Sequence, residues 1–381
     1  MTGPTPRIAL IRQKYTSFGG AERFAAAALE ALVEQGARLS VITRNWRHQP
    51  GVEAVRVDPF YVGRLWRDRG FARMACAVVE KRGFDLVQSH ERLPCCDIYR
   101  AGDGVHREWL HQRGRTLSLL GRLMQFLSPY HRHVRAMERR VFTSPRLQAV
   151  ICNSEMVRQE VLDHFGPIKA RLEVIYNAVD LDRFSPLLRS RFRQALLAEL
   201  VIPERSLVFL FVGSGYARKG LVQVLHALKQ LPLHCYLVVV GKDRHARRYE
   251  RLAQRLGVAA RVRFVGPQED TTPYYGAADA FVLPTLYDPF PNVVLEAMAS
   301  GLPVVTSRKC GAVDLIRDGE NGYVCDALDV EGLTWRMREL LDHGVRERLG
   351  YASRKLVEGW NAEQMAGRLL GLYQELLAEA D

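Results

Sequence analysis

Two carboxylates stand eight positions apart in the segment LYDPFPNVVLEAMASGLPVV, which spans residues 286–305. Asp288 precedes an expected helix, and Glu296 lies about one turn inside it among small and apolar residues. A carboxylate there can accept two hydrogen bonds from a vicinal diol such as that of a ribose. Asp288 can accept from the hydroxyls of a second ring, which backbone N–H groups near 291–293 can also bind. The spacing therefore fits a clamp on a two-ring ligand, with a solvated surface glutamate as the alternative.

The helix that carries Glu296 has limits that the sequence indicates. The strand AFVLPT (280–285) comes before it, and Gly301 with Pro303 ends it. Two starts remain open, because Asn292 can cap the helix or Pro291 can occupy its first turn.

Arg218 and Lys219 precede another expected helix in the segment VGSGYARKGL (212–221), where a loop containing Gly213 follows a strand. Adjacent cations at a helix N-terminus oppose the helix dipole and gain nothing structurally. They are explained if a phosphate group binds there. The spacing is not that of a P-loop, because the pattern G-x-x-x-x-G-K-S/T is absent.

A further glycine-containing loop occurs near the start of the chain, in KYTSFGGAERF (14–24). Gly19 and Gly20 fall between a strand and a helix, where a ligand can approach the backbone and the helix N-terminus favours negative charge. A tight turn between strand and helix explains the same pair, so the glycines alone leave both interpretations open.

Polar residues are dense in SHERLPCCDIYRAGDGVHREW (89–109), directly after a buried strand. Asp103 lies between two glycines, with His90 and His106 nearby. A structural Gly-Asp-Gly turn and a group that contacts a substrate both remain possible for Asp103.

Alternating strands and helices must position these residues. The N-terminal half contains the strand 7–13, a helix from about 20 to 35 with Gly36 as its C-terminal cap, and the strand RLSVITR. Further strands are expected at 84–90, 147–154 and 171–180, with a helix capped by Asn153 or Ser154. The pattern repeats in the second half, with strands at 207–213, 235–241, RVRFVG, 280–285 and 302–307.

This order predicts an α/β fold with two tandem Rossmann-like, doubly wound domains that face a central cleft. We expect an N-terminal domain at 1–180 and a C-terminal domain at 181–355. The helix at 356–381 is expected to pack back towards the N-terminal domain. Ligands of such sheets bind at the carboxyl ends of the strands.

The excess of positive charge lies almost wholly in the N-terminal half. Residues 1–180 hold 28 Lys and Arg against 18 Asp and Glu, whereas the remainder holds 26 against 24. Such a half suggests an acidic partner: nucleic acid, anionic lipid or a phosphorylated substrate. Arginines and apolar residues alternate in 111–148, a pattern typical of an element that lies on an anionic membrane surface. A helical pair with a solvated basic face is the alternative.

Several classes of protein are disfavoured by composition. No apolar run approaches the roughly 18 residues of a membrane span. The apolar stretch near the N-terminus is too short for a signal peptide and is expected to be a strand. Seven cysteines include the adjacent pair Cys95 and Cys96, which suits neither a disulfide framework nor a zinc pair, so we expect thiols in a reducing cytosol. No convincing metal-binding cluster or nucleic-acid-binding motif is present.

The segments GGAERF, GSGYARKG and LEAMASGLPVV together resemble the retaining glycosyltransferase family 4, whose fold is GT-B. The resemblance covers nearly the whole chain. Its features KY-x-x-FGG, ARKG and the Asp of YRAGDG are most similar to the lipopolysaccharide core glucosyltransferase I branch.

The resemblance implies a role for each matching residue. Glu296 would bind the ribose of a nucleotide sugar, and Asp288 would contact the transferred sugar. Asp103 would lie near the reacting centre and contact the acceptor with His90 and His106. The remaining donor-binding residues would be Gly19, Gly20 and Gly213, the diphosphate-binding pair Arg218 and Lys219, Val265 and Gly266 beside the base, and Phe290, Pro291, Asn292 and Val293 through backbone groups.

Two positions depart from the pattern of the family. Asp288 stands where Glu is usual, which puts the identity of the donor sugar in doubt, and Arg218 is adjacent to Lys219 instead of following the first glycine. Arg218, Lys219 and backbone amides would neutralise the leaving diphosphate without a metal or cofactor, and transfer would retain the anomeric configuration.

The resemblance predicts a cytoplasmic, monomeric enzyme, peripheral on the inner face of the membrane. It would move a hexose, glucose first, from a UDP-sugar to a lipopolysaccharide core or another lipid-linked acceptor. The alternatives are transfer to O-antigen, capsule or another glycan, a nucleotide-sugar epimerase of the same fold, and a sugar-binding protein without activity. A nucleic-acid partner is not expected.

Overall fold

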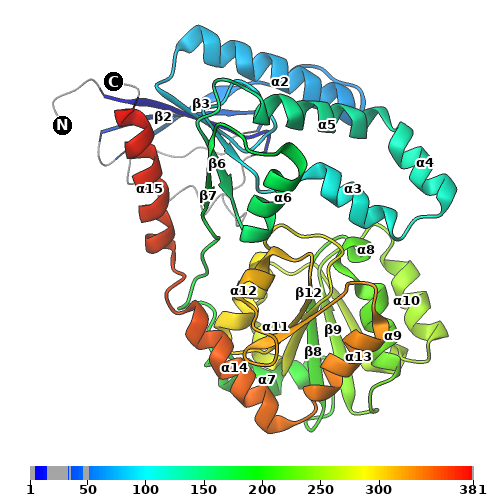
Figure 1. Ribbon diagram of the computed structural model, residues 1–381. Helices are drawn as coiled ribbons and strands as arrows, with labels where there is room; N and C mark the ends of the chain where they lie inside the picture. Colours follow the sequence, from blue (N-terminus) through cyan, green and yellow to red (C-terminus); the bar gives the residue numbers. More distant parts are fainter. Residues whose placement is uncertain (1–4, 15–32, 34–35, 46–50, 380–381) are drawn as a thin grey trace. The chain divides into compact units, whose positions relative to one another are not determined.

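The structure is a computed structural model that describes residues 5–14, 33, 36–45 and 51–379, and its chain divides into two units. The N-terminal unit comprises Met1–Asn177 with Ala362–Asp381, and the C-terminal unit comprises Ala178–Asn361. The first division lies three residues before the predicted boundary at 180, and the second lies six residues after the one predicted at 355. Each unit is built around one parallel sheet with helices on it (Figure 1).

The N-terminal unit has a seven-stranded sheet in the order β3-β2-β1-β4-β5-β6-β7, with every pair parallel. Its strands are β1 (Arg7–Ile11), β2 (Arg38–Thr43), β3 (Val52–Arg56), β4 (Leu86–Ser89), β5 (Ile98–Arg100), β6 (Ala149–Cys152) and β7 (Arg171–Val174). Its described helices are α2 (Gly63–Arg82), α3 (His106–Gly114), α4 (Leu119–Leu127), α5 (Pro129–Phe142), α6 (Glu155–Phe165) and α15 (Ala362–Ala378). Strands β4 and β6 are buried throughout, as expected of central strands in a parallel sheet covered on both faces.

The C-terminal unit has a six-stranded parallel sheet in the order β10-β9-β8-β11-β12-β13. Its strands are β8 (Leu207–Val212), β9 (Cys235–Val240), β10 (Val262–Gly266), β11 (Ala280–Leu283), β12 (Val304–Ser307) and β13 (Gly322–Cys325). Its helices are α7 (Leu188–Glu199), α8 (Tyr216–Lys219), α9 (Leu221–Lys229), α10 (Ala246–Arg255), α11 (Thr272–Ala277), α12 (Asn292–Ala299), α13 (Val330–Glu339) and α14 (His343–Val357), with 3-10 turns η1 (Ala259–Arg261) and η2 (Gly311–Leu315).

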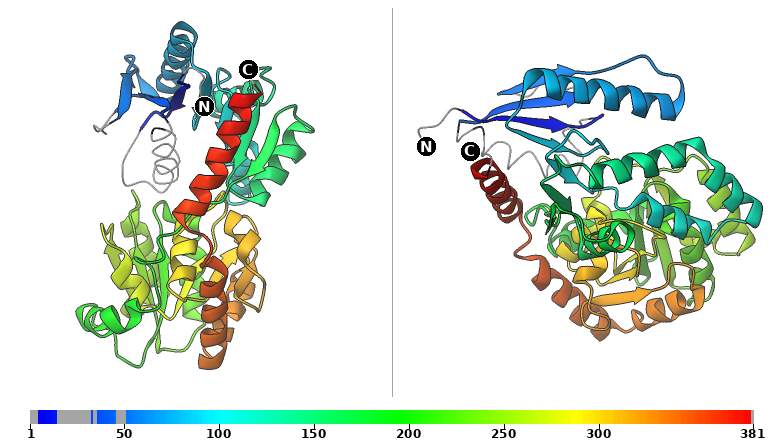
Figure 2. Two further views of the ribbon diagram at one scale, coloured as in Figure 1. Left: turned by 90° about the vertical axis from the view of Figure 1, so that its left-hand side faces the viewer. Right: turned by 45° about the horizontal axis from the view of Figure 1, so that its top comes forward.

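The last helix, α15, returns to the N-terminal unit. Figures 1 and 2 show it alongside the sheet of that unit, and two side-chain contacts hold it there. The hydroxyl of Tyr373 donates to Oε1 of Gln88 in β4 at 2.7 Å, and Arg171 of β7 pairs with Glu375 at 2.8 Å. Leu369 and Leu376 are buried beneath the helix, so α15 is part of the core of this unit.

Several local expectations can be compared with the structure. Ser154 caps α6 by accepting from the N–H of Val157, which settles the choice between Asn153 and Ser154. Gly36 has a φ of +94°, in the region expected for a cap glycine. The helix predicted from about 20 to 35 lies outside the described residues except at Val33, which is helical.

One expectation was wrong, and one alternative that the sequence left open is excluded. A disulfide joins Cys76 in α2 to Cys95, with their Cα atoms 5.6 Å apart, so these two cysteines are not free thiols. The two cysteines are 19 positions apart and are brought together by packing, which neighbours in the chain do not indicate. Asn292 does not cap α12 either: the cap position is Pro291, without a side-chain hydrogen bond, and Asn292 is the first helical residue.

Candidate functional site

A buried group of opposite charges lies at the carboxyl end of the sheet in the C-terminal unit. Oδ2 of Asp288 accepts a hydrogen bond from Nζ of Lys219 and another, 2.8 Å long, from Nη1 of Arg218. Lys219 and Asp288 are 6% and 7% exposed, whereas the Arg218 side chain is more than a third exposed. The sequence predicted that these three residues share a site, but not that the carboxylate pairs directly with both cations.

The loop that presents these cations depends on glycine at two positions. A Cβ on Gly213 would lie 3.3 Å from Cγ of Lys219, so the absence of a side chain lets the lysine cross the end of β8. Gly220 has a φ of +81°, and a Cβ there would lie 2.1 Å from the carbonyl oxygen of Pro284. Any other residue at 220 would push the loop away from β11.

Asp288 is fixed by its backbone as well as by its side chain. Its N–H donates to the carbonyl of Lys309 at 2.9 Å, and its carbonyl accepts from the N–H of Gly311 at 2.8 Å. Burial acts to raise the pKa of Asp288, but Lys219 and Arg218 outweigh burial, so this pKa lies below its ordinary value. The group is therefore an ionised acid between two cations.

Glu296 lies half-buried on α12, about two turns along the chain from Asp288. The hydroxyl of Tyr275 donates to Oε2 of Glu296 at 2.8 Å and also lies 3.3 Å from the carbonyl of Val293. Burial, followed by the charge of Glu296, raises the pKa of Tyr275 well above its ordinary value, so the tyrosine remains a donor. Tyr275 thereby fixes the orientation of the carboxylate.

The remaining residues predicted for this unit lie on the same edge of the sheet. Gly213 and Gly241 follow β8 and β9, Gly266 is the last residue of β10, and the N–H of Gly241 donates to the carbonyl of Gly266 at 2.8 Å. The carbonyl of Val265 accepts from Gln268 at 2.8 Å. Phe290 and Pro291 are buried just before α12, and Asn292 and Val293 are half-buried in its first turn.

The residues predicted in the N-terminal unit fall into two separate networks. Asp103 is in an exposed turn, with a side chain that is 79% exposed and pairs with Arg92 at 3.5 Å. Arg92 also pairs with Glu138, whose Oε1 accepts the N–H of His106 at 2.9 Å. Burial, with nearby cations and His131, lowers the pKa of His106 to about 3, so its ring is neutral. Asp103 and His106 thus belong to one network of ion pairs and hydrogen bonds, through Arg92 and Glu138.

His90 belongs to the other network, at the end of β4. Its Nδ1 lies 3.0 Å from Arg12 and its Nε2 lies 3.1 Å from Gln88. Burial and the charges of Arg100 and Arg12 hold the pKa of His90 well below its ordinary value. Nearby, the buried Oδ1 of Asn153 makes no hydrogen bond within the described part of the chain. Gly19 and Gly20 lie outside the described residues.

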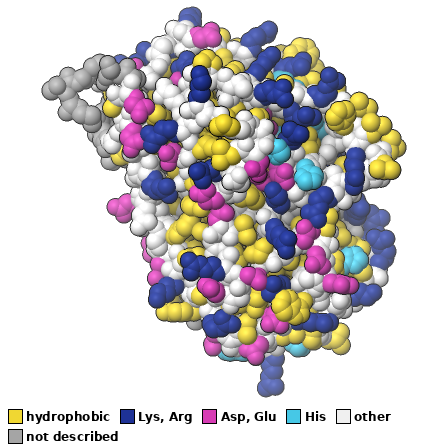
Figure 3. Space-filling view, viewed as in Figure 1, with side chains coloured by type: hydrophobic (Ala, Val, Ile, Leu, Met, Phe, Trp, Pro, Cys, Tyr) yellow, Lys and Arg dark blue, Asp and Glu magenta, His cyan; other side chains and the backbone are white. Residues whose placement is uncertain are grey.

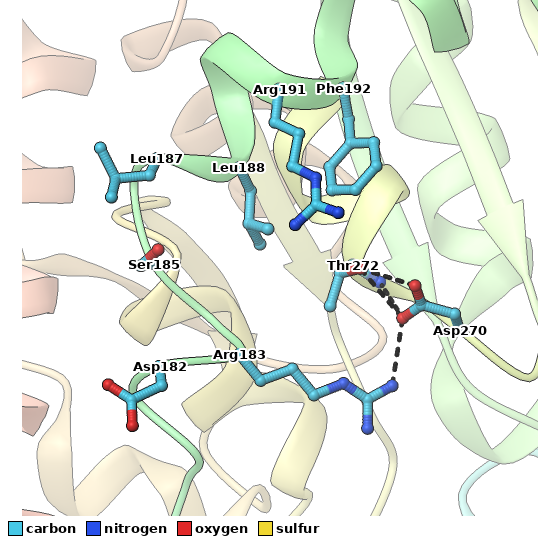
Figure 4. A pocket seen from close by; sticks show the side chains of 9 residues that line it. All are labelled: Asp182, Arg183, Ser185, Leu187, Leu188, Arg191, Phe192, Asp270 and Thr272. Carbon is cyan, nitrogen blue, oxygen red and sulfur yellow. Dashed lines mark hydrogen bonds and ion pairs between the residues drawn. The ribbon is translucent and has the colours of Figure 1, made fainter.

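A cavity of about 490 Å³ in the C-terminal unit lies apart from the Asp288 group, beside the start of α7 (Figure 4). Arg183 points across it to Asp270, 3.1 Å away, and Asp270 also accepts from the hydroxyl and the N–H of Thr272. The charged groups Arg183 and Asp270 of this cavity are therefore already paired with each other.

Two further features are absent from the described residues. These residues contain no group of three or more His, Cys, Asp or Glu side chains placed to hold a metal ion. None of their helices combines the length and the apolar character that crossing a bilayer requires.

Comparison with known families places the chain. A family model described as "Glycosyl transferases group 1" matches residues 192–356, and one described as "Glycosyltransferase Family 4" matches residues 18–183. The two matches lie in different units and together take in most of the chain. The chain belongs to glycosyltransferase family 4.

Two relatives of this glycosyltransferase match over most of their length. The lipopolysaccharide core biosynthesis glycosyltransferase LpsE of Rhizobium meliloti (strain 1021) is 28% identical over 367 residues, covering 94% of this chain and 96% of LpsE. The lipopolysaccharide glucosyltransferase WaaG of Escherichia coli (strain K12) is 26% identical over 323 residues, covering 83% of this chain and 84% of WaaG.

Solved structures give the fold. A crystal structure of WaaG matches with a TM-score of 0.81 at 24% identity, covering 96% of this chain and 99% of that one. Anabaena Alr3699/HepE in complex with UDP-glucose matches with a TM-score of 0.72 at 18% identity, covering 97% and 99%. The two parallel-sheet, Rossmann-like units of this glycosyltransferase have the GT-B fold that the sequence predicted.

Two residues of the glycosyltransferase site were not found from the sequence. Tyr275 lies in TTPYYGAADA, a segment without a recognisable motif, yet it orients Glu296. Asp243 follows β9 and accepts the N–H of Tyr216 at 2.7 Å, which fixes the start of the loop that carries Arg218. A polar residue directly after a buried strand was the available signal for Asp243.

Proposed function

We propose that this glycosyltransferase moves a hexose, glucose first, from a UDP-sugar to a lipopolysaccharide core or a related lipid-linked acceptor. The proposal rests on the buried contact of Lys219 and Arg218 with Asp288, which precedes the helix that carries Glu296. The names of LpsE and WaaG support the acceptor class. The complex of HepE with UDP-glucose supports the donor class.

Each part of the nucleotide sugar would have a binding partner in the C-terminal unit. Glu296, oriented by Tyr275, would accept two hydrogen bonds from the ribose hydroxyls. Val265 and Gly266 would lie beside the base. Gly213 would give the diphosphate access to Arg218 and Lys219. The groups around 290–293 would face the sugar.

Asp288 can contact the two cations and the transferred sugar at the same time. Its Oδ2 carries the contacts with Lys219 and Arg218, while its Oδ1 makes no hydrogen bond in the described part of the chain. We assign Oδ1 to a hydroxyl of the transferred sugar. An aspartate is one methylene shorter than the usual glutamate, so this hydroxyl would have to approach more closely or be bridged by water.

The proposed reaction exchanges one bond for another on the same face of the sugar. The bond from the anomeric carbon to the diphosphate oxygen breaks as the acceptor oxygen bonds to that carbon, and the acceptor proton passes to the phosphate. Arg218 and Lys219 would stabilise the charge that develops on the leaving diphosphate, without a metal. Retention of configuration follows from attack on the face that the leaving group occupied.

The acceptor would bind to the N-terminal unit. Its sheet carries polar groups at the carboxyl end, including His90 and the buried amide of Asn153. Asp103 is exposed and held by Arg92, so it can accept from an acceptor hydroxyl. His106 is neutral at physiological pH and can exchange hydrogen bonds without adding charge.

We further propose that the N-terminal unit lies on the cytoplasmic face of the membrane, with the enzyme as a monomer. Helix α4 has no buried residue, and six of its nine side chains are large, apolar and exposed: Leu119, Leu120, Leu123, Met124, Phe126 and Leu127. Figure 3 shows this apolar group with Lys and Arg side chains beside it. An apolar surface next to arginines fits a bilayer that contains anionic lipid.

Substitution of Lys219 tests the donor site. Lys219→Ala removes the buried cation and should lower transfer of radiolabelled glucose from UDP-glucose to purified lipopolysaccharide core by about 10²–10³-fold or more. Glu296→Gln should weaken binding of UDP in a thermal-shift assay. The exposed Lys229 gives the control, because Lys229→Ala removes the same charge away from the site. Normal transfer by Lys219→Ala would refute the site. Release of free sugar without an acceptor would favour an epimerase.

A further inference from the structure

A stripe of arginines covers one face of helix α10 in the C-terminal unit. Its members on the helix recur at the spacing that aligns side chains on a helix face, namely Arg247, Arg248, Arg251 and Arg255, and Arg244 lies just before the helix begins. All five are exposed, and Figure 3 shows Lys and Arg side chains gathered over α10. The opposite face packs on the unit through the buried residues Tyr249 and Ala253.

This arrangement is unfavourable for the helix by itself. No acidic residue stands in the first turn of α10, where Arg247 and Arg248 oppose the dipole. Arg247 with Arg251, and Arg251 with Arg255, are like charges four positions apart, which destabilises a helix. None of the five arginines forms an ion pair with a carboxylate in the part of the chain that the structure describes. An ordinary solvated face would alternate its charges, so the stripe calls for an anionic partner.

A cavity lies at the amino-terminal part of this stripe. It has a volume of about 510 Å³ and is lined by Arg244, His245, Ala246, Arg247, Arg248 and Arg251, with Asp243 as its one acid. Both oxygens of Asp243 are already used, since Oδ2 accepts from the N–H of Tyr216 and Oδ1 from that of His245, each at 2.7 Å. Asp243 keeps its charge, so the lining sets four arginines against one carboxylate and carries an excess of positive charge.

The cavity wall is continuous with the loop of the donor site. The N–H of Gly215 donates to the carbonyl of Lys242 at 3.1 Å, and the hydroxyl of Tyr216 donates to the carbonyl of Gly241 at 2.8 Å. Arg218 and Lys219, by contrast, are already held by Asp288. The arginine cavity is thus a neighbour of the donor site with a separate set of cations.

We propose that this cavity binds a phosphate group other than the diphosphate of the donor. Guanidinium forks match phosphate oxygens in pairs, and an arginine holds its charge at any physiological pH. The ligand is either a soluble phosphate ester or the phosphate of an anionic lipid headgroup. This site goes beyond the proposed transfer reaction, because that reaction needs no second anion in the C-terminal unit.

The test compares two double variants of the full chain. Arg247→Gln with Arg251→Gln removes two exposed charges from the stripe, and Arg205→Gln with Lys229→Gln removes two from the opposite, amino-terminal edge of the same sheet. Inorganic pyrophosphate is titrated calorimetrically into protein saturated with UDP. In a second arm, sedimentation measures binding to phosphatidylcholine vesicles with and without phosphatidylglycerol. The stripe variant should weaken binding in at least one arm by about tenfold or more.

The two arms separate the sources of the phosphate. A loss confined to pyrophosphate indicates a soluble ester, and a loss confined to phosphatidylglycerol vesicles indicates a headgroup. Equal effects of the two double variants, or no effect of the stripe variant on either probe, would overturn the inference. A lower affinity for UDP in the stripe variant would also overturn the inference, because the cavity would then be part of the donor site. That result would not contradict the proposed transferase function. Failure of the unaltered chain to bind UDP would contradict the proposed function alone.

Discussion

At the scale of single residues, the shorter acid at position 288 has a structural explanation. Asp288 reaches Lys219 and Arg218 with one oxygen, and two backbone hydrogen bonds hold it in place. Burying these charges is unfavourable unless they compensate one another. Because a bound diphosphate would bring its own negative charge to the same cations, Asp288 and the donor phosphate would share these cations as counter-charges.

This sharing of the cations predicts an effect of UDP on stability that depends on Asp288. Asp288→Asn leaves a buried lysine without its charge partner, which should destabilise the protein without ligand by about 3–5 kcal/mol. UDP restores a counter-charge, so it should raise the melting temperature of the variant by more than that of the unaltered protein. Thermal unfolding of both proteins with and without UDP measures the difference.

Asp279 provides the matched control for that comparison. It is also buried between two cations, Arg189 at 3.0 Å and Arg193 at 3.1 Å, but it precedes β11 at the other edge of the sheet. Asp279→Asn should destabilise the protein equally with and without UDP. If UDP stabilises Asp288→Asn and the unaltered protein by the same amount, the diphosphate does not share the cations with Asp288.

At the scale of elements, most strands could be located from the sequence, including the edge strands β7 and β10, and three could not. Strands β8 and β9 are buried almost throughout and were predicted within a residue. Strands β3, β5 and β13 were not predicted. Only one residue of β3 is buried, and β5 has three residues of which one is Arg100. Such strands exist because a neighbouring strand pairs with them, which a local pattern does not record.

The candidate site shows the same limit. Arg218 and Lys219 were predicted because adjacent cations before a helix are locally unfavourable without a ligand, and most other residues of the site were predicted by resemblance to the family. The ion pair between Lys219 and Asp288 joins loops 69 positions apart and depends on Gly220 approaching Pro284. Tyr275 reaches Glu296 across 21 positions. Pairings of this kind follow from the packing of the sheet, and the residue types alone do not determine them.

Helix α4 allows a prediction about membrane binding. Leu120→Gln with Met124→Gln should lower the affinity for vesicles that contain phosphatidylglycerol by about tenfold or more, because apolar area no longer enters the bilayer. The melting temperature should change little, since both side chains are 66% exposed. Leu233→Gln, at an 82% exposed leucine of the C-terminal unit, should leave sedimentation with vesicles unchanged. Equal binding by all three proteins would show that α4 does not contact the bilayer.

At the scale of the whole molecule, the chain ends in the unit in which it begins. Helix α14 packs on α12 in the C-terminal unit, whereas α15 places Leu369 and Tyr373 in the core of the N-terminal unit. The amphipathic pattern of the last segment predicted a helix, and this helix was expected to pack back towards the N-terminal domain. The stability of the N-terminal unit therefore depends on residues that are last in the sequence.

This dependence gives a prediction that distinguishes the two units. Leu369→Ala removes a fully buried side chain and should cost about 2–5 kcal/mol, locally in the N-terminal unit. Amide hydrogen exchange in β4 should become about 30-fold faster or more, while exchange in β8 stays unchanged. Leu349→Ala, at an equally buried leucine of α14, should have the opposite pattern. If both variants accelerate exchange in both sheets alike, the two units unfold together and α15 stabilises the whole chain.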